Sequence, residues 1–158
     1  SVLASGSEDT TVKLWDLRYP DKYLSTIENH ADEVRCIRFH PHLRLMVTGG
    51  IDKTAKLSRA TGKTYCYTAT TPTNESAVQA VDFTADGKKL LSVCSNRLKV
   101  WTVNDGSNKL SGSQDIILPA KGFHSLNVLN QQVMAVSIHQ ASISVWGYDL
   151  QLLPKNEN

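Results

Sequence analysis

The sequence predicts an all-β protein made of repeated antiparallel sheets, and three observations lead to this fold class. First, a position recurs about every 43 residues: Trp15 is followed at that interval by Ser58 and Trp101, and 45 residues later by Trp146. Second, short runs alternate apolar and polar residues, which is the pattern of half-buried strands. Third, turn signals such as Asp86-Gly87 separate these runs, and no amphipathic helix of useful length interrupts them.

Several independent positions share this period. The residues Gly6, Asp9, Thr11, Lys13 and Leu14 return as Gly49, Asp52, Thr54, Lys56 and Leu57. A repeat of 40–45 residues with glycine, aspartate and tryptophan at fixed offsets is typical of the blades of a β-propeller. The pattern therefore favours a binding platform over a catalyst.

We expect a partial propeller of about four four-stranded antiparallel blades, with the first and last blades incomplete. The blades are expected at about 1–28, 33–69, 77–119 and 122–150, and residues 151–158 form a polar tail. The expected strands are Val2–Gly6, Thr11–Asp16 and Tyr23–Ile27, then Val34–His40, Leu45–Gly49, Ala55–Arg59 and Thr64–Thr68, then Val78–Thr84, Lys89–Cys94, Arg97–Val103 and Ser113–Leu118, and finally Phe123–Leu129, Val133–Ile138 and Ser142–Asp149. Because such a ring usually needs about seven blades, the chain is expected to be a fragment of a longer protein, the alternative being a half-propeller that closes with a partner.

Composition narrows the function classes. The net charge of +2 does not indicate nucleic acid or membrane as a partner. No apolar run is long enough to cross a bilayer, and we expect no secretory signal. Three isolated cysteines, Cys36, Cys66 and Cys94, are expected as buried thiols in a reducing, cytoplasmic compartment. In Val34–Phe39, the alternation predicts Val34, Cys36 and Phe39 on the buried side.

The repeated polar residues have a structural explanation. A hydrogen-bonded chain of histidine, aspartate, serine or threonine, and tryptophan would pin the loops of each blade. The members predicted for this network are Ser5, Asp9 and Trp15, then His30, Thr48 and Asp52, then Ser92, Asn96 and Trp101, and finally Trp146. These residues resemble the WD-repeat family, most closely over Val2–Arg18, whereas Ser58 stands where the second repeat should have tryptophan.

Catalytic and cofactor chemistry is not predicted. A hydrolase triad of Ser5, Asp9 and His30 is the weaker interpretation, because the trio repeats along the chain and no nucleophile elbow accompanies it. His40 and His42 flank a proline without further ligands at metal spacing. We therefore expect no enzyme activity, no cofactor and no metal.

A narrower resemblance concerns the end of the chain. The stretches LASGSEDTTVKLWDLR, VRCIRFHP and, above all, LKVW followed by NQQVMAVSIHQASISVWGYDL are similar to the last propeller blades of the large regulatory subunit of katanin. This resemblance implies a non-catalytic partner of a microtubule-severing ATPase, located on microtubules and at the centrosome or spindle poles. The catalytic subunit would bind through regions outside this chain.

The first repeat supports a rival function. Leu3 to Arg18 resembles the pattern by which some WD-repeat proteins dock onto the adaptor of a cullin-RING ubiquitin ligase, with Asp16 and Arg18 as the contacting residues. A generic WD-repeat adaptor is the remaining alternative. The segment from Arg35 to Lys63 contains seven basic residues and one acidic residue. This excess of positive charge is interpreted either as a solvated face or as a docking strip for an acidic tubulin tail. The candidate partner contacts are Glu8, Asp16, Arg18, Glu33, Arg35, Ile51, Lys53, Lys56 and Arg59.

Overall fold

The computed structural model describes residues 2–19, 21–61, 64–71, 74–104, 109–118, 122–129, 132–139 and 142–149. This part of the chain folds into the strands β1 (Val2–Gly6), β2 (Val12–Asp16), β3 (Tyr23–Ile27), β4 (Val34–Phe39), β5 (Leu45–Gly50), β6 (Ala55–Thr61), β7 (Thr64–Thr70), β8 (Val78–Phe83), β9 (Lys89–Cys94), β10 (Arg97–Asn104), β11 (Lys109–Ile117), β12 (Phe123–Leu129), β13 (Gln132–His139) and β14 (Ser142–Asp149). Within these residues there is no helix long and apolar enough to span a membrane.

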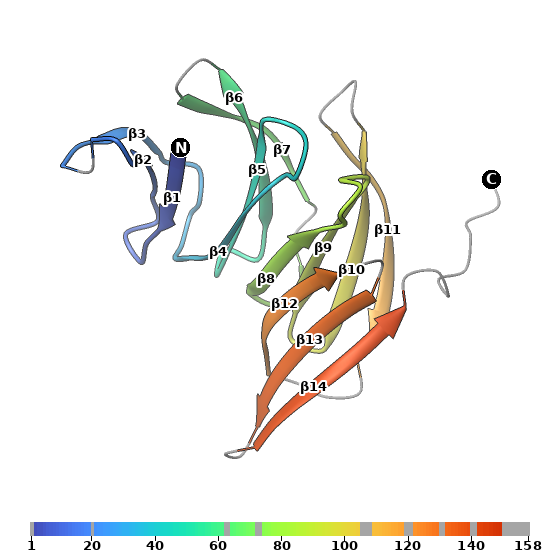
Figure 1. The fold of residues 1–158 in the computed structure, drawn as a ribbon. Coiled ribbons are helices and arrows are strands. Elements are labelled where there is room, and N and C mark those ends of the chain that lie inside the picture. Colours follow the sequence, from blue (N-terminus) through green and yellow to red (C-terminus); the bar gives the residue numbers. More distant parts are fainter. Residues whose placement is uncertain are drawn as a thin grey trace.

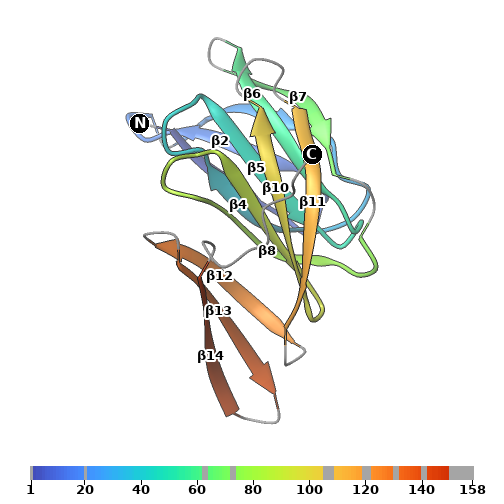
Figure 2. The same ribbon diagram turned by 90° about the vertical axis from the view of Figure 1, so that its right-hand side faces the viewer.

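The strands form four antiparallel sheets that follow one another along the chain (Figure 1). The first contains β1-β2-β3, the second β4-β5-β6-β7, the third β8-β9-β10-β11 and the fourth β12-β13-β14. The first strands of the last three sheets, β4, β8 and β12, lie side by side in both views, and each is an edge strand of its own sheet (Figures 1 and 2). The predicted fold class, an all-β partial propeller, is confirmed.

The hydrophobic core lies between successive sheets because each strand buries alternate residues. One cluster joins the first and second sheets and includes Leu14 and Met46. A second cluster joins the second and third sheets and includes Leu57 and Trp101. A third joins the third and fourth sheets through residues such as Phe123. Full burial of side chains of this size stabilises the fold by about 1.5–3 kcal/mol each.

The recurring glycines mark close approaches between neighbouring sheets. A Cβ atom on Gly6 would lie 2.6 Å from a methyl carbon of Val34, and one on Gly49 would lie 2.6 Å from the equivalent carbon of Val78. In both cases a strand of one sheet presses against the first residue of the next sheet. Absence of a side chain at this position explains why glycine belongs to the repeat.

The strands β4, β8 and β12, called the inner strands below, each contain a β-bulge at the same place. The ladder of β4 and β5 skips from Val34 to Cys36, which leaves Arg35 without a partner in the register. Gln79 is skipped in β8 and His124 in β12. An alternating apolar pattern contains no signal for such an insertion, so the bulges were not predicted.

Other features differ from the sequence-based expectations. Phe39 is 38% exposed rather than buried, and its ring lies edge-on against Tyr65 with 6.0 Å between centroids. Cys66 is exposed because it lies on the outer strand β7, whereas Cys94 is buried as expected and Cys36 is half-buried. The strand expected from Ser113 begins earlier, as β11, because it pairs with the full length of β10.

Candidate interaction surface

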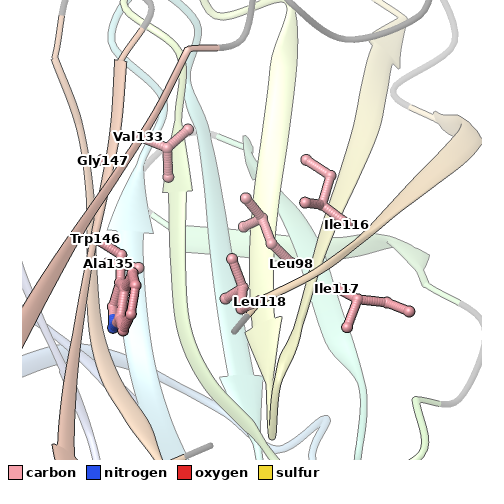
Figure 3. Close-up of a pocket in the computed structure, with 8 residues that line it drawn as sticks. All are labelled: Leu98, Ile116, Ile117, Leu118, Val133, Ala135, Trp146 and Gly147. Carbon is pink, nitrogen blue, oxygen red and sulfur yellow. The ribbon is translucent and has the colours of Figure 1, made fainter. Parts of the chain in front are cut away.

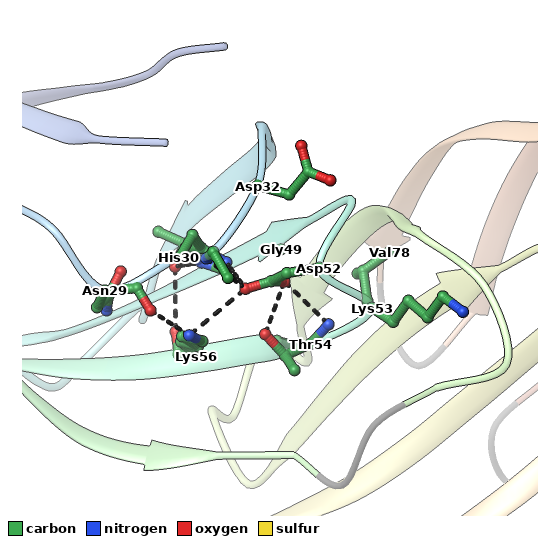
Figure 4. A network of polar contacts seen from close by, with 12 residues as sticks. Asn29, His30, Asp32, Gly49, Asp52, Lys53, Thr54, Lys56 and Val78 are labelled. Atoms are coloured by element: carbon green, nitrogen blue, oxygen red, sulfur yellow. Dashed lines mark hydrogen bonds and ion pairs between the residues drawn. The ribbon is translucent and has the colours of Figure 1, made fainter. Parts of the chain in front are cut away.

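A buried polar network closes one end of the second sheet (Figure 4). The loop between β3 and β4 places the His30 side chain, which is fully buried, against the turn between β5 and β6. Its Nδ1 lies 2.9 Å from Asp52 Oδ2, and its Nε2 lies 2.7 Å from Thr48 Oγ1. Asp52 also accepts hydrogen bonds from the backbone N–H groups of Ala31 and Thr54. The structure thus brings together the three residues proposed for this sheet.

Lys56 belongs to the same network. Its Nζ lies 3.4 Å from Asp52 Oδ2 and donates a hydrogen bond to the carbonyl of Asn29, and its side chain is only 15% exposed. Lys56 is therefore an internal group, which corrects its assignment as a partner contact. A sequence pattern could not reveal this role, because the accepting carbonyl lies 27 residues away.

Burial and hydrogen bonding set the charges of the network. Desolvation lowers the pKa of His30, and the neighbouring Asp52 carboxylate opposes this shift without cancelling it. Desolvation alone would raise the pKa of Asp52, but hydrogen bonds from Thr54 and Ala31 outweigh it and leave the pKa below its usual value. The arrangement is a neutral imidazole beside a carboxylate–ammonium pair. Such an arrangement fixes loops and offers no exposed nucleophile.

The second sheet lacks the indole that the other three sheets possess. Ser58 is fully buried where the repeat would have tryptophan, and its hydroxyl finds no hydrogen-bond partner within the part of the chain that the structure describes. The indole N–H donates to serine in the other sheets: from Trp15 to Ser5 over 2.9 Å, from Trp101 to Ser92 over 3.2 Å, and from Trp146 to Ser137 over 3.3 Å. Ser137 was missed, although its spacing of nine residues from the tryptophan is the same as that of Ser92.

The remaining proposed network residues make fewer contacts. Asp9 is exposed and accepts from Thr11 through both the backbone N–H, at 3.0 Å, and the hydroxyl, at 2.7 Å. The Thr11 hydroxyl is the main reason that the pKa of Asp9 is lowered. Asn96 lies in the turn between β9 and β10, where its backbone carbonyl accepts from Leu118. No histidine bonds to either residue among the hydrogen bonds of the described chain.

Asp16 and Arg18 form a fork at the end of β2. Arg18 Nε donates to Asp16 Oδ1 over 2.9 Å and Nη2 donates to Oδ2 over 2.6 Å. The hydrogen bonds from Arg18 hold the pKa of Asp16 well below its usual range. The Asp16 side chain is 10% exposed and that of Arg18 is 71% exposed. Only Arg18 is therefore positioned to touch a partner, and Asp16 acts by orienting it.

The other candidate contacts differ in exposure. Glu8 and Lys53 are exposed, and Ile51 is half-buried instead of standing out in a surface turn. Glu33 Oε2 lies 2.7 Å from Arg35 Nη2, so these two residues form an ion pair beside the inner strand β4.

The basic residues between Arg35 and Lys63 do not form a continuous strip. Arg38 on β4 faces Asp82 on β8 at 3.5 Å. Arg59 is exposed on β6, a different strand of the sheet. Lys63 lies outside the described residues. The charges are therefore divided between the inner strand, the buried network and the outer surface.

Two concave features lie next to the fourth sheet. An apolar pocket of about 230 Å³ opens between β10–β11 and β13–β14, where Leu98, Ile116 and Trp146 line it (Figure 3). A polar recess of about 270 Å³ lies along the inner strands β4, β8 and β12. Among the described residues, no cluster of three or more histidine, cysteine, aspartate or glutamate side chains could hold a metal ion.

The family assignment rests on this repeated architecture and on direct comparison. The model of the WD domain, G-beta repeat, matches residues 1–16, 21–57 and 65–102, and the chain belongs to the WD-repeat family. Members of this family are generally non-catalytic scaffolds that bind other proteins.

Three relatives illustrate the range of similar proteins. The APC/C activator protein CDH1 of Saccharomyces cerevisiae is 31% identical over 72% of this chain and 21% of its own length. WD repeat-containing protein 1 of Mus musculus is 28% identical over 98% of this chain and 24% of its own length. DDB1- and CUL4-associated factor 10 of Danio rerio is 41% identical over 32% of this chain and 10% of its own length. The chain thus spans no more than about a quarter of any of these proteins, and none of the three is a katanin subunit.

Proposed function

We propose that this chain is part of a non-catalytic regulatory subunit of a katanin microtubule-severing complex. Its propeller would help to bring the ATPase to microtubules and to the centrosome or spindle poles, and regions outside this chain would bind the catalytic subunit. The observation that carries the proposal is the closing segment NQQVMAVSIHQASISVWGYDL. The WD-repeat model stops at residue 102, yet β12, β13 and β14 still form an antiparallel sheet with Trp146 bonded to Ser137. We take the sequence of this sheet, which departs from the usual repeat, as the point of resemblance to the katanin subunit.

Co-sedimentation tests the proposal. The full-length protein is mixed with intact microtubules and with microtubules whose acidic tubulin tails have been removed, at two salt concentrations. Binding should need the tails and should weaken as salt rises, because exposed charges are screened. Lys53→Glu with Arg59→Glu should reduce binding, since both residues are exposed. If the amount of protein that sediments with microtubules is unchanged by removal of the tails, by salt and by both substitutions, the microtubule assignment is wrong.

A ubiquitin-ligase substrate receptor is the second candidate function. The fork described above presents the Arg18 guanidinium in a fixed orientation with most of the side chain in solvent. A relative named as a DDB1- and CUL4-associated factor supports this candidate. Capture of the full-length protein by the purified ligase adaptor should be lost on Arg18→Ala. Capture that survives this substitution would exclude docking through the fork.

A further inference from the structure

The three bulged residues meet at one place. Arg35, Gln79 and His124 occupy equivalent positions in β4, β8 and β12, and all three line the polar recess of about 270 Å³. A bulge removes one residue from the ladder and redirects its side chain. Repetition of the bulge in three neighbouring sheets therefore gathers a guanidinium, a carboxamide and an imidazole around a common recess.

The backbone adds to the polarity of the recess. Strands β4, β8 and β12 are edge strands, and no strand of the described chain pairs with their inner edges. Edge strands present backbone N–H and C=O groups that remain available to a ligand. The recess therefore lies beside strand edges of three sheets with which no further strand of the described chain pairs.

The two arginines of the recess differ in how firmly they are held. Arg38 faces Asp82, whose second carboxylate oxygen also accepts the backbone N–H of Val128 at 2.8 Å, so Asp82 joins three sheets. Arg35 instead pairs with Glu33, and the two side chains are 47% and 30% exposed. A partly exposed ion pair contributes little to stability. Arg35 can therefore exchange Glu33 for another carboxylate at small cost.

We propose that this recess binds an acidic peptide segment of a partner protein. A carboxylate of the segment pairs with Arg35, because arginine recognises carboxylates through two parallel hydrogen bonds. Gln79 and His124 donate further hydrogen bonds from the neighbouring sheets, and Glu33 is the internal competitor for the same guanidinium. The inference does not rest on the microtubule assignment.

Fluorescence anisotropy tests the site with the full chain and a fluorescein-labelled peptide that contains eight glutamates. Arg35→Gln should weaken binding by about tenfold, the usual effect of losing one hydrogen-bonded charge. Glu33→Gln should tighten binding by about threefold, since it frees Arg35 from its internal partner. Lys22→Gln removes the same charge from an exposed position outside the recess and should leave affinity unchanged within about twofold.

Glu33→Gln and Arg35→Gln should change the affinity for the peptide in opposite directions, so loss of folding cannot explain both results. A variant that merely unfolded could not bind more tightly, and circular dichroism of each variant checks the strand content. Equal loss of affinity in Arg35→Gln and Lys22→Gln would show that only net charge matters and would overturn the proposal. Unchanged affinity in Glu33→Gln, or equal binding of the peptide with glutamine in place of glutamate, would also overturn it.

Discussion

Asp52 links four other residues of the buried network, and its replacement by alanine tests the structural role of that network. The carboxylate accepts from His30, Thr54 and the Ala31 backbone and pairs with Lys56. Removal of one partner from a buried ion pair costs about 3–5 kcal/mol. Because the Lys56 side chain remains 15% exposed, water can partly solvate its charge after Asp52 is removed. We therefore expect a loss at the lower end of this range, about 3 kcal/mol in the free energy of unfolding.

Asp9→Ala is the matched control, because Asp9 occupies the same position in the first repeat. Asp9 is exposed, and its carboxylate accepts hydrogen bonds from Thr11, two residues along the chain, so its loss should be clearly smaller. Urea unfolding of both variants, followed by circular dichroism, gives the two differences. Equal destabilisation of the two variants, or a loss below about 1 kcal/mol for Asp52→Ala, would show that the buried network does not anchor the sheet.

Three further predictions follow from single residues. The pKa of His30 is lowered from 6.5 in the folded protein, so the unfolded chain binds more protons and stability should fall as pH drops below about 6.5. Unfolding titrations between about pH 7 and 5 should show this fall in the wild-type protein, and His30→Gln should flatten it. Gly87→Ala should destabilise the protein by about 3 kcal/mol in the same assay, because φ is +71° and a Cβ would lie 2.2 Å from the His40 ring; a change below about 1 kcal/mol would contradict this packing. Iodoacetamide should modify the exposed Cys66 and spare native Cys36, whose pKa burial raises to about 12, and mass spectrometry that finds the two equally labelled would refute the assignment.

The sequence predicted the fold because the signals for strands and turns are local. Each expected strand is present, since alternating side chains and turns such as Asp86-Gly87 act over a few residues. The WD-repeat resemblance was confirmed for the same reason: glycine and tryptophan recur where successive sheets touch.

The details of the candidate surface depend on contacts that no local pattern contains. Phe39 has the right phase for burial, but it lies at the end of β4 and remains partly exposed. Lys56 looks like a surface cation until the Asn29 carbonyl, distant in sequence, is placed beside it. The recess residue Arg35 was proposed as a partner contact, whereas its equivalents Gln79 and His124 were not, because only the register of paired strands shows that the three correspond.

The bulges have a consequence for how such repeats diversify. A residue that stands outside the hydrogen-bond ladder can be exchanged without altering the register of the strands around it. Positions 35, 79 and 124 can thus acquire new chemistry one at a time while the sheets stay as they are. Different residues of the same strand therefore serve recognition and folding. Partner specificity can change at these three positions without loss of the fold, and they are the first sites to choose for redesign.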